Sequence, residues 1–239
     1  MTSSRNWSEL EGPSSLTRLR LITKFLHKYK LGGKGIDIGC RTGTLAKALN
    51  NHFKYLVGID ISRPAIDEAT RSFPSGNFYV ADITDLMSLP KTLFDVAICS
   101  DVLEHIEEDV TALQNTNRIL KPDGYLILTT PSGMKNWTRH DDWAHHVRRY
   151  EPDELQKKLC QAGFDVEEIF TWGYPVYNAY YELFLQRLNP KKAKTWKTRS
   201  HTREMSFHFL SKLFALDDLF VWTDRGRRLF AVATKRESE

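Results

Sequence analysis

Acidic residues follow the apolar segments of this sequence at regular points. Asp37, Asp60, Asp82 and Asp101 each lie at or just after a short apolar run. If these runs are parallel strands of one sheet, their carboxyl ends meet at one edge and bring the carboxylates together. Any one of these acids could simply cap a helix or a loop. Four in succession favour a ligand site instead.

The first of these acids lies in "GIDIGCRTG", a strand that runs into a glycine turn and a helix. Gly39 and Gly43 let the backbone approach a ligand closely. Asp60 follows about 20 residues later, where a carboxylate binds ribose hydroxyl groups. A dinucleotide's pyrophosphate favours a full G-x-G-x-x-G turn without a nearby negative charge. Asp37 beside the turn therefore suits S-adenosylmethionine, which carries a sulfonium, an ammonium and a ribose but no phosphate.

Histidines follow the fifth apolar run, in "SGMKNWTRHDDWAHHVRRY". With a pKa near 6.5, a histidine on an active-site loop can act as a general base for a hydroxyl substrate. We rank His145 first and His146 second, with His105 of "DVLEHI" third. The alternative is that the His-His-Val-Arg-Arg run only anchors the loop to the sheet. The string shows no diagnostic ligand spacing, so we expect no metal.

Short apolar runs alternate with helical segments from residue 34 onwards, which predicts an α/β fold with a parallel sheet covered on both faces. The expected strands cover residues 35–39, 55–61, 77–82, 94–101, 124–131, 164–172 and 228–236. This pattern predicts a doubly wound, mostly parallel, seven-stranded Rossmann-like sheet with an antiparallel last strand and a helical insertion before it.

We expect one domain over residues 1–239, because the length suits a single α/β core. Its parts are an N-terminal helix (14–31), a cofactor-binding core (34–172), a helical substrate-lid insertion (173–227) and the final strand (228–236).

Two sets of side chains outside the core have both a structural and a functional interpretation. Arg18 and Arg20 of the N-terminal helix could pair with the cofactor carboxylate, although a solvated helix face is the favoured interpretation. The aromatic residues of the insertion recur at helical spacing, which fits a core stripe or a lid over a substrate pocket. They are Tyr174, Tyr177, Tyr181 and Phe184.

Five motifs, "IDIGCRTG", "GIDIS", "ADITDL", "FDVAICSDVLEHI" and "LKPDGYLILTTPS", resemble in order and spacing those of class I S-adenosylmethionine-dependent methyltransferases. The resemblance is strongest to the small-molecule group that includes the ubiquinone-pathway O-methyltransferases. It covers residues 30 to 172 and the final strand.

The resemblance implies a role for residues at each strand end. Asp60 would bind the ribose hydroxyls, Ile61 would pack on the adenine face, and Ser100 would lie near the methionine moiety. The other implied cofactor-binding residues are the turn residues Asp37, Gly39, Cys40, Arg41 and Gly43, and the adenine-contacting pair Asp82 and Ile83.

Arg41 departs from the family, because glycine is commoner at its position. If the position needs a positive φ, an arginine there is strained by about 1 to 2 kcal/mol. We expect a working turn nonetheless, because the residues around it fit.

These observations predict a cytoplasmic methyltransferase that moves a methyl group from S-adenosylmethionine to a small molecule, most readily to a hydroxyl oxygen. The alternatives are an N-methyltransferase, a catalytically silent cofactor-binding or interaction protein and, less favoured, a nicotinamide-dependent oxidoreductase.

Other partners are less well indicated. The residues after the fourth strand, "CSDVLEH", lack the motif of nucleic acid base methyltransferases, so we expect no nucleic acid partner. The basic run 187–203 could contact an anionic membrane weakly. The sequence leaves the oligomeric state open. The three cysteines, Cys40, Cys99 and Cys160, lie in apolar segments, which predicts buried, reduced thiols.

Overall fold

The computed structural model describes residues 12–89, 91–184 and 201–236. The strands are β1 (Lys34–Ile38), β2 (Tyr55–Asp60), β3 (Asn77–Val80), β4 (Phe94–Ser100), β5 (Leu120–Pro131), β6 (Phe164–Trp172) and β7 (Arg228–Lys235). The α-helices are α1 (Pro13–Lys28), α2 (Thr44–Leu49), α3 (Arg63–Ser72), α4 (Asp109–Ile119), α5 (Arg139–Ala144), α6 (Pro152–Gln161), α7 (Val176–Leu183) and α8 (His201–Phe214).

Short 3-10 turns join some of these elements. They are η2 (Asn50–His52), η3 (Leu86–Ser88), η4 (Leu103–His105), η5 (Met134–Asn136) and η8 (Ala215–Phe220).

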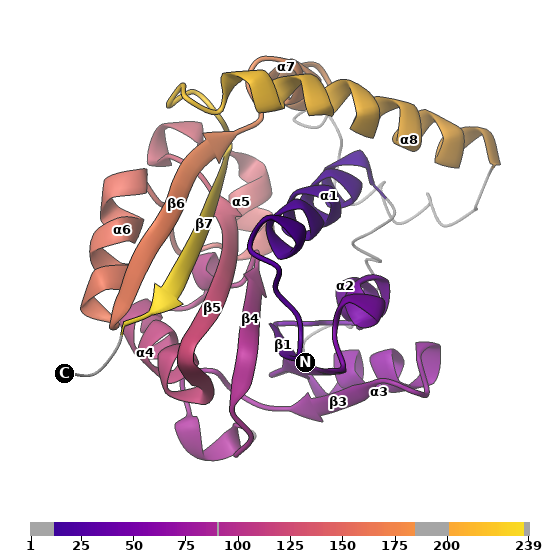
Figure 1. Cartoon of the computed structure of the whole chain (residues 1–239). Helices are drawn as coiled ribbons and strands as arrows, with labels where there is room; N and C mark the ends of the chain where they lie inside the picture. The colour runs from indigo at the N-terminus through magenta and orange to yellow at the C-terminus, as the bar shows by residue number, and fades with distance from the viewer. Residues whose placement is uncertain (1–11, 90, 185–200, 237–239) are drawn as a thin grey trace.

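The strands form one seven-stranded sheet in the order β3-β2-β1-β4-β5-β7-β6 (Figure 1). The neighbouring pairs from β3 to β5 are parallel, whereas β7 runs antiparallel to both β5 and β6. The predicted fold class is thereby confirmed, including the direction of the last strand.

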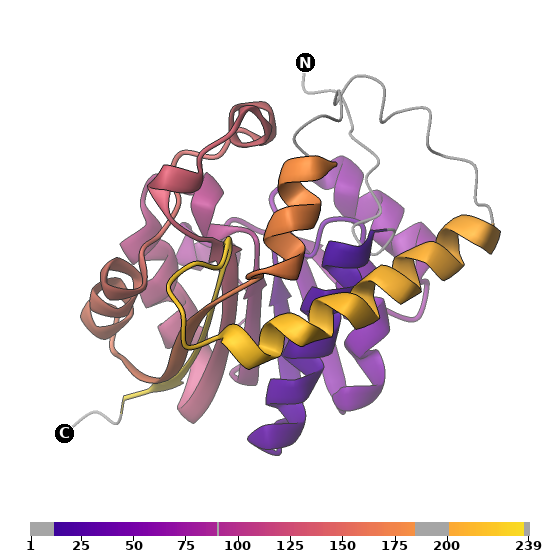
Figure 2. The same ribbon diagram turned by 90° about the horizontal axis from the view of Figure 1, so that it is seen from above.

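Helices cover both faces of this sheet, which is why most residues of its central strands are buried. Six of the seven residues of β4 are buried. On one face the core joins α4 and α6 to the sheet, and on the other it joins α1, α2, α7 and α8 to it. The view from above shows the sheet between these layers (Figure 2).

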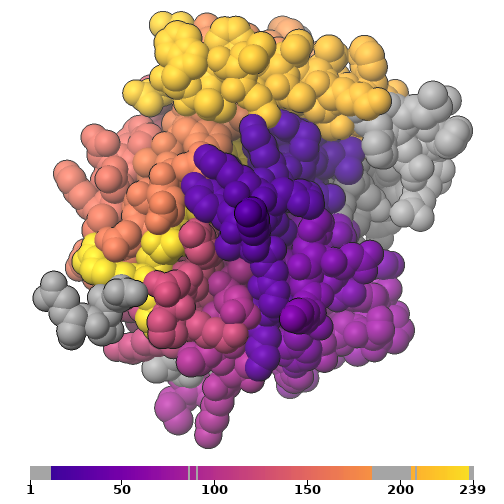
Figure 3. All heavy atoms as spheres, in the orientation of Figure 1, coloured from indigo at the N-terminus to yellow at the C-terminus, as the bar shows by residue number. Residues whose placement is uncertain are grey.

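The insertion before β7 folds against the N-terminal helix. α8 lies along α1 in both ribbon views, and in the space-filling view its atoms form a ridge above α1 (Figures 1, 2 and 3). The guanidinium of Arg20 makes two hydrogen bonds to Asp218, of 2.7 and 2.8 Å. The expectation of a solvated position for Arg20 was therefore wrong, because a partner almost 200 residues away in the chain holds it.

The aromatic residues of α7 belong mainly to the core. Tyr177 and Tyr181 are buried and pack with Trp172 and Phe214. Only Phe184, at the end of the stripe, is exposed. The structure therefore supports the core interpretation for the two central tyrosines.

Two further expectations have different outcomes. Cys40 and Cys99 are buried as predicted, but Cys160 is exposed because it lies on the outer side of α6. Most of the basic run 187–203 lies outside the described residues, so its proposed membrane contact stays a prediction. Within the described ranges, we find no helix with the length and apolar character needed to cross a bilayer.

Candidate active site at the carboxyl edge of the sheet

The strand order reverses between β1 and β4, which are neighbours in the sheet. The chain continues from β1 to β2 on one side of this pair, and from β4 to β5 on the other side. In doubly wound sheets the loops diverge at such a point and leave a crevice outside the carboxyl ends of the strands. The predicted cofactor residues lie at this edge, at the end of β1 and in the turn after it, and at or after the ends of the neighbouring strands.

The turn after β1 requires glycine at two positions. Gly39 and Gly43 have φ values of 70° and 74°, in the left-handed region. A Cβ atom at Gly39 would lie 2.3 Å from Cγ2 of Val102, so the glycine lets the turn pack against the segment after β4. Cys40 is buried, and its backbone N–H donates to the carbonyl of Ile59 at 2.9 Å. These contacts join the turn to both neighbouring strands.

Arg41 adopts a left-handed conformation with a φ of 48°. Its backbone N–H donates a 3.0 Å hydrogen bond to Oδ2 of Asp60. The position therefore does require a positive φ, and the arginine carries a backbone strain of about 1 to 2 kcal/mol. The hydrogen bond to Asp60 helps to hold it.

The end of β2 places a carboxylate beside an exposed apolar side chain. Oδ1 of Asp60 accepts the Ser62 N–H at 2.8 Å and Oδ2 accepts that of Arg41, so the carboxylate is fixed in orientation. Each oxygen keeps a further acceptor position. Ile61 follows and is 69% exposed. A fixed acceptor beside an open apolar surface suits a ribose and its attached base.

The remaining predicted cofactor residues are more enclosed. Asp82 accepts two 2.8 Å hydrogen bonds from Thr84, through N–H and Oγ1, and Ile83 is buried. Asp37 is buried within β1, and buried Ser100 lies 3.1 Å from Thr129 between their hydroxyl oxygens. Asp82 and Ile83 follow β3, and Ser100 ends β4, at the same edge as the turn.

Histidines from two loops meet above this edge. The ring centroids of His105 and His146 lie 4.7 Å apart, and those of His140 and His146 lie 6.4 Å apart. His105 ends η4 after β4, whereas His140 and His146 belong to α5 and the residues after it. His145 is exposed, and its left-handed φ of 60° ends α5. The rings of His105 and His146 are therefore in edge-to-face contact.

One carboxylate holds the His146 ring in place. Nδ1 of His146 lies 2.7 Å from Oδ1 of Asp141, which is fully buried. Arg149 donates from Nε and Nη2 to Asp141 at 2.8 and 2.9 Å, and Thr138 donates from N and Oγ1 at 2.7 and 2.9 Å. Burial alone would raise the pKa of Asp141, but the hydrogen bonds from His146 and Arg149 outweigh it and hold that pKa well below its usual range.

Glu104 completes this cluster and was not among the predicted site residues. Its Oε1 lies 4.0 Å from Nε2 of His146, and Oε2 accepts a 3.1 Å hydrogen bond from Thr130. Oε1 has no hydrogen-bond partner among the described residues. Burial raises the pKa of Glu104 to about 7. The sequence signal was its place directly before His105, in a segment that follows a strand.

The cluster also has the donor chemistry of a cation site. One ligand atom from each of Glu104, His105 and His146 lies within 4.8 Å of the others. Carboxylate and imidazole donors at this spacing could hold a divalent ion.

Two arginines flank the same edge. Arg18 of α1 and Arg228 of β7 both form ion pairs with Oδ2 of Asp101, directly after β4. Arg18 is buried, so the expectation that it lies on a solvated helix face was wrong. The reason is again a distant partner, which the local helical pattern does not reveal.

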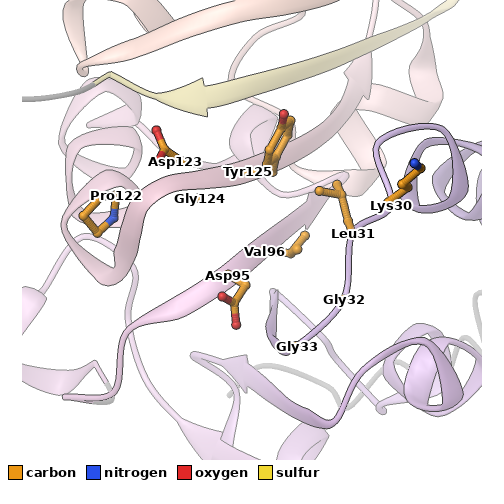
Figure 4. A pocket seen from close by; sticks show the side chains of 10 residues that line it. All are labelled: Lys30, Leu31, Gly32, Gly33, Asp95, Val96, Pro122, Asp123, Gly124 and Tyr125. Atoms are coloured by element: carbon orange, nitrogen blue, oxygen red, sulfur yellow. The ribbon is translucent and has the colours of Figure 1, made fainter.

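An open pocket lies elsewhere on the molecule. It has a volume of about 380 Å³ and is lined by the connection from α1 to β1, the start of β4 and the first half of β5 (Figure 4). Asp95 at its wall accepts hydrogen bonds from Lys34 and Lys121. These residues lie at the amino ends of the parallel strands, on the opposite edge from the histidines.

The fold and the carboxyl-edge site define a class I S-adenosylmethionine-dependent methyltransferase. The chain belongs to the methyltransferase domain family, which matches residues 14–169. Among curated proteins it is similar to a ubiquinone biosynthesis O-methyltransferase of Thiobacillus denitrificans, with 25% identity over 193 residues, 74% of this chain and 83% of the relative. The protein of the same name from Coxiella burnetii is 30% identical over 122 residues, 47% of this chain and 52% of the relative.

Solved structures show the same fold. The N-methyltransferase NodS from Bradyrhizobium japonicum WM9, in complex with S-adenosyl-L-homocysteine, superposes with a TM-score of 0.62. The two chains are 17% identical, and the match covers 97% of this chain and 92% of the other. At this identity the likeness concerns the fold alone.

Proposed function

We propose that the enzyme transfers the methyl group of S-adenosylmethionine to a hydroxyl oxygen of a small molecule, with His146 as the general base. The observation that carries the proposal is the 2.7 Å contact between Nδ1 of His146 and Asp141. A carboxylate at Nδ1 keeps the proton on that nitrogen and leaves Nε2 as the acceptor.

The residues of the strand edge fit the cofactor. Asp60 would accept the ribose hydroxyls, the exposed face of Ile61 would cover the adenine, and the turn at Gly39 brings backbone close to the methionine part. Asp82 and Ile83 would lie beside the adenine, and Asp37, Cys40, Gly43 and Ser100 would support the methionine side. When bound there, the cofactor supplies a methyl group on a positively charged sulfur.

A hydroxyl acceptor gains more from this arrangement than an amine would. A neutral amine already carries a nucleophilic lone pair, whereas a hydroxyl must lose its proton as the new bond forms. Nε2 of His146 takes that proton, and a positioned base of this kind contributes about 10²- to 10⁴-fold to the rate. We choose His146 over His145 because the ring of His146 is oriented by a buried partner, while His145 is exposed.

The relatives support the oxygen assignment by their names only, because the ubiquinone biosynthesis enzymes are O-methyltransferases. The NodS structure is named an N-methyltransferase, so the fold itself is neutral on this point.

The test is methyl transfer to a panel of hydroxyl and amine compounds, with S-adenosylhomocysteine and the methylated product measured by mass spectrometry. We expect methyl ethers from hydroxyl compounds. Activity on amines alone would contradict the oxygen assignment. Cofactor binding without any turnover would favour a silent binding protein, and binding of NADH instead would favour an oxidoreductase.

A further inference from the structure

One carboxylate at the end of β4 is shared by two arginines from opposite ends of the chain. Oδ2 of Asp101 faces Nη1 of Arg18 and Nη2 of Arg228. Its other oxygen accepts a 3.1 Å hydrogen bond from Oγ1 of Thr129, and the backbone N–H of Asp101 donates to the Thr129 carbonyl at 2.9 Å. Asp101 is therefore fixed, and Arg228 is fixed through it.

Asp101 is shared, because its Oδ2 pairs with Arg18 as well as with Arg228. Asp101 is the only hydrogen-bond partner of the Arg228 guanidinium among the described residues, and the contact uses Nη2 alone. The Arg228 side chain keeps 18% of its area exposed, and no described residue accepts a hydrogen bond from its Nε or Nη1. A guanidinium that keeps a planar set of unused N–H donors matches a carboxylate in shape and charge.

Arg228 also lies at the carboxyl edge of the sheet, where the candidate active site is. It pairs in register with Pro131, the last residue of β5, whose following loop carries His146. Its positive charge acts on Glu104 of the histidine cluster, where it opposes the effect of burial on the Glu104 pKa. A group bound at Arg228 would therefore lie at the same edge of the sheet as the histidine cluster.

We propose that Arg228 binds a carboxylate of the acceptor, so that the substrates of this enzyme are hydroxylated carboxylic acids. This inference rests on the proposed methyl transfer to a hydroxyl group. The cofactor carries a carboxylate of its own, so the experiment separates the two sources of that group.

The experiment compares several hydroxy acids, each with its own methyl ester, in the wild-type enzyme and in Arg228→Gln. For the wild type we expect kcat/KM to be about 10- to 100-fold higher for an acid than for its ester, because hydrogen bonds to charged groups are the strong ones. Arg228→Gln loses this preference, mainly through KM for the acid, and changes kcat/KM for the ester much less than for the acid. Calorimetry gives the same Kd for S-adenosylhomocysteine in both proteins.

Two variants serve as controls. Arg236→Gln removes the same charge from the other end of β7, where Arg236 pairs with Asp165 on the surface, and changes none of these constants. Arg228→Lys keeps a positive charge and retains part of the preference for acids. If Arg228→Gln fails to fold, Arg228→Lys still tests the inference.

Several outcomes would overturn the inference. One is equal use of acids and esters by the wild type, which would leave the oxygen assignment intact. Another is an Arg228→Gln variant that binds S-adenosylhomocysteine more weakly but keeps its preference for acids, which would assign Arg228 to the cofactor carboxylate.

If no hydroxyl compound is methylated, the proposed function fails and binding decides the inference separately. A hydroxy acid that binds the enzyme loaded with S-adenosylhomocysteine, but not Arg228→Gln, supports the carboxylate site. Equal binding to both proteins, or to neither, contradicts it.

Discussion

His146 and Asp141 form a hydrogen-bonded pair in which Nδ1 and Oδ1 lie 2.7 Å apart, while Nε2 of His146 faces Glu104 at 4.0 Å. Asp141 is held in turn by Arg149 and by the cap of α5 at Thr138. The loop after β5 is thus built around one buried carboxylate. Its anchoring function, predicted as the alternative to catalysis, is compatible with catalysis because the same carboxylate orients the ring.

Asp141→Asn tests Asp141 as a positioning residue. An amide at this position no longer stabilises the imidazolium that forms when His146 takes a proton. We expect kcat to fall by about 10- to 100-fold, the usual cost of removing such an outer partner. KM for the cofactor should stay unchanged, which separates positioning from binding.

The matched control is Asp142→Asn, one residue further along α5, where the carboxylate meets Nε1 of Trp137 on the surface. Its kinetic constants should equal those of the wild type. Similar losses in both variants, or a loss explained by unfolding in circular dichroism, would argue against a specific role for Asp141.

Glu104→Gln tests the buried carboxyl group through stability. Burial raises the Glu104 pKa from 4.5 to about 7, so the folded state disfavours its charged form. The stability present below pH 4.5 is therefore lost as the pH rises through 7, by on the order of 2 to 3 kcal/mol. Glu104→Gln should remove this part of the pH dependence.

The measurement is chemical denaturation of both proteins at pH 5 and pH 8. We expect the difference in unfolding free energy between the two pH values to be smaller in the variant. An identical pH dependence in the two proteins would mean that Glu104 does not titrate in this range.

Arg41→Gly tests the strained turn. Glycine adopts a positive φ without strain but loses more backbone entropy on folding, so we expect a net gain in stability of about 0.5 to 1 kcal/mol. The backbone hydrogen bond to Asp60 remains possible in the variant, so the Kd for S-adenosylhomocysteine should stay within about threefold. Thermal denaturation and calorimetry, with NADH as the control ligand, check both values. A large loss of affinity would show that the arginine side chain itself contacts the cofactor.

The sheet and most of its helices could be predicted because their signals are local. Mainly apolar runs such as residues 94–100 identify central strands, and the expected bounds agree closely with the observed ones except at β5, which begins at Leu120 and not at residue 124. α5 was expected to be loop, since a six-residue polar helix has little periodicity and depends on the capping box between Thr138 and Asp141.

The candidate site was predictable only in part, because several of its contacts join segments that are distant in the chain. Acids at strand ends and histidines on one loop can be found from their positions in the sequence. The partners of Arg18, Arg228 and Glu104 come from distant segments, and only the folded chain brings them together. The sequence likewise carries no local signal for the contact between His146 and Asp141, because that contact depends on the loop's conformation.

The most direct test of the account is the rate of methyl transfer to a hydroxyl substrate by His146→Gln, measured in a single turnover with the enzyme saturated by S-adenosylmethionine. We predict a loss of about 10²- to 10⁴-fold with an unchanged Kd for S-adenosylhomocysteine, while His145→Gln stays near the wild-type rate and dialysis against EDTA has no effect on the wild type. A His146→Gln enzyme that retains the wild-type rate would contradict the account. So would a wild-type enzyme that EDTA inactivates and a divalent ion restores, because Nε2 would then bind a metal and not the substrate proton.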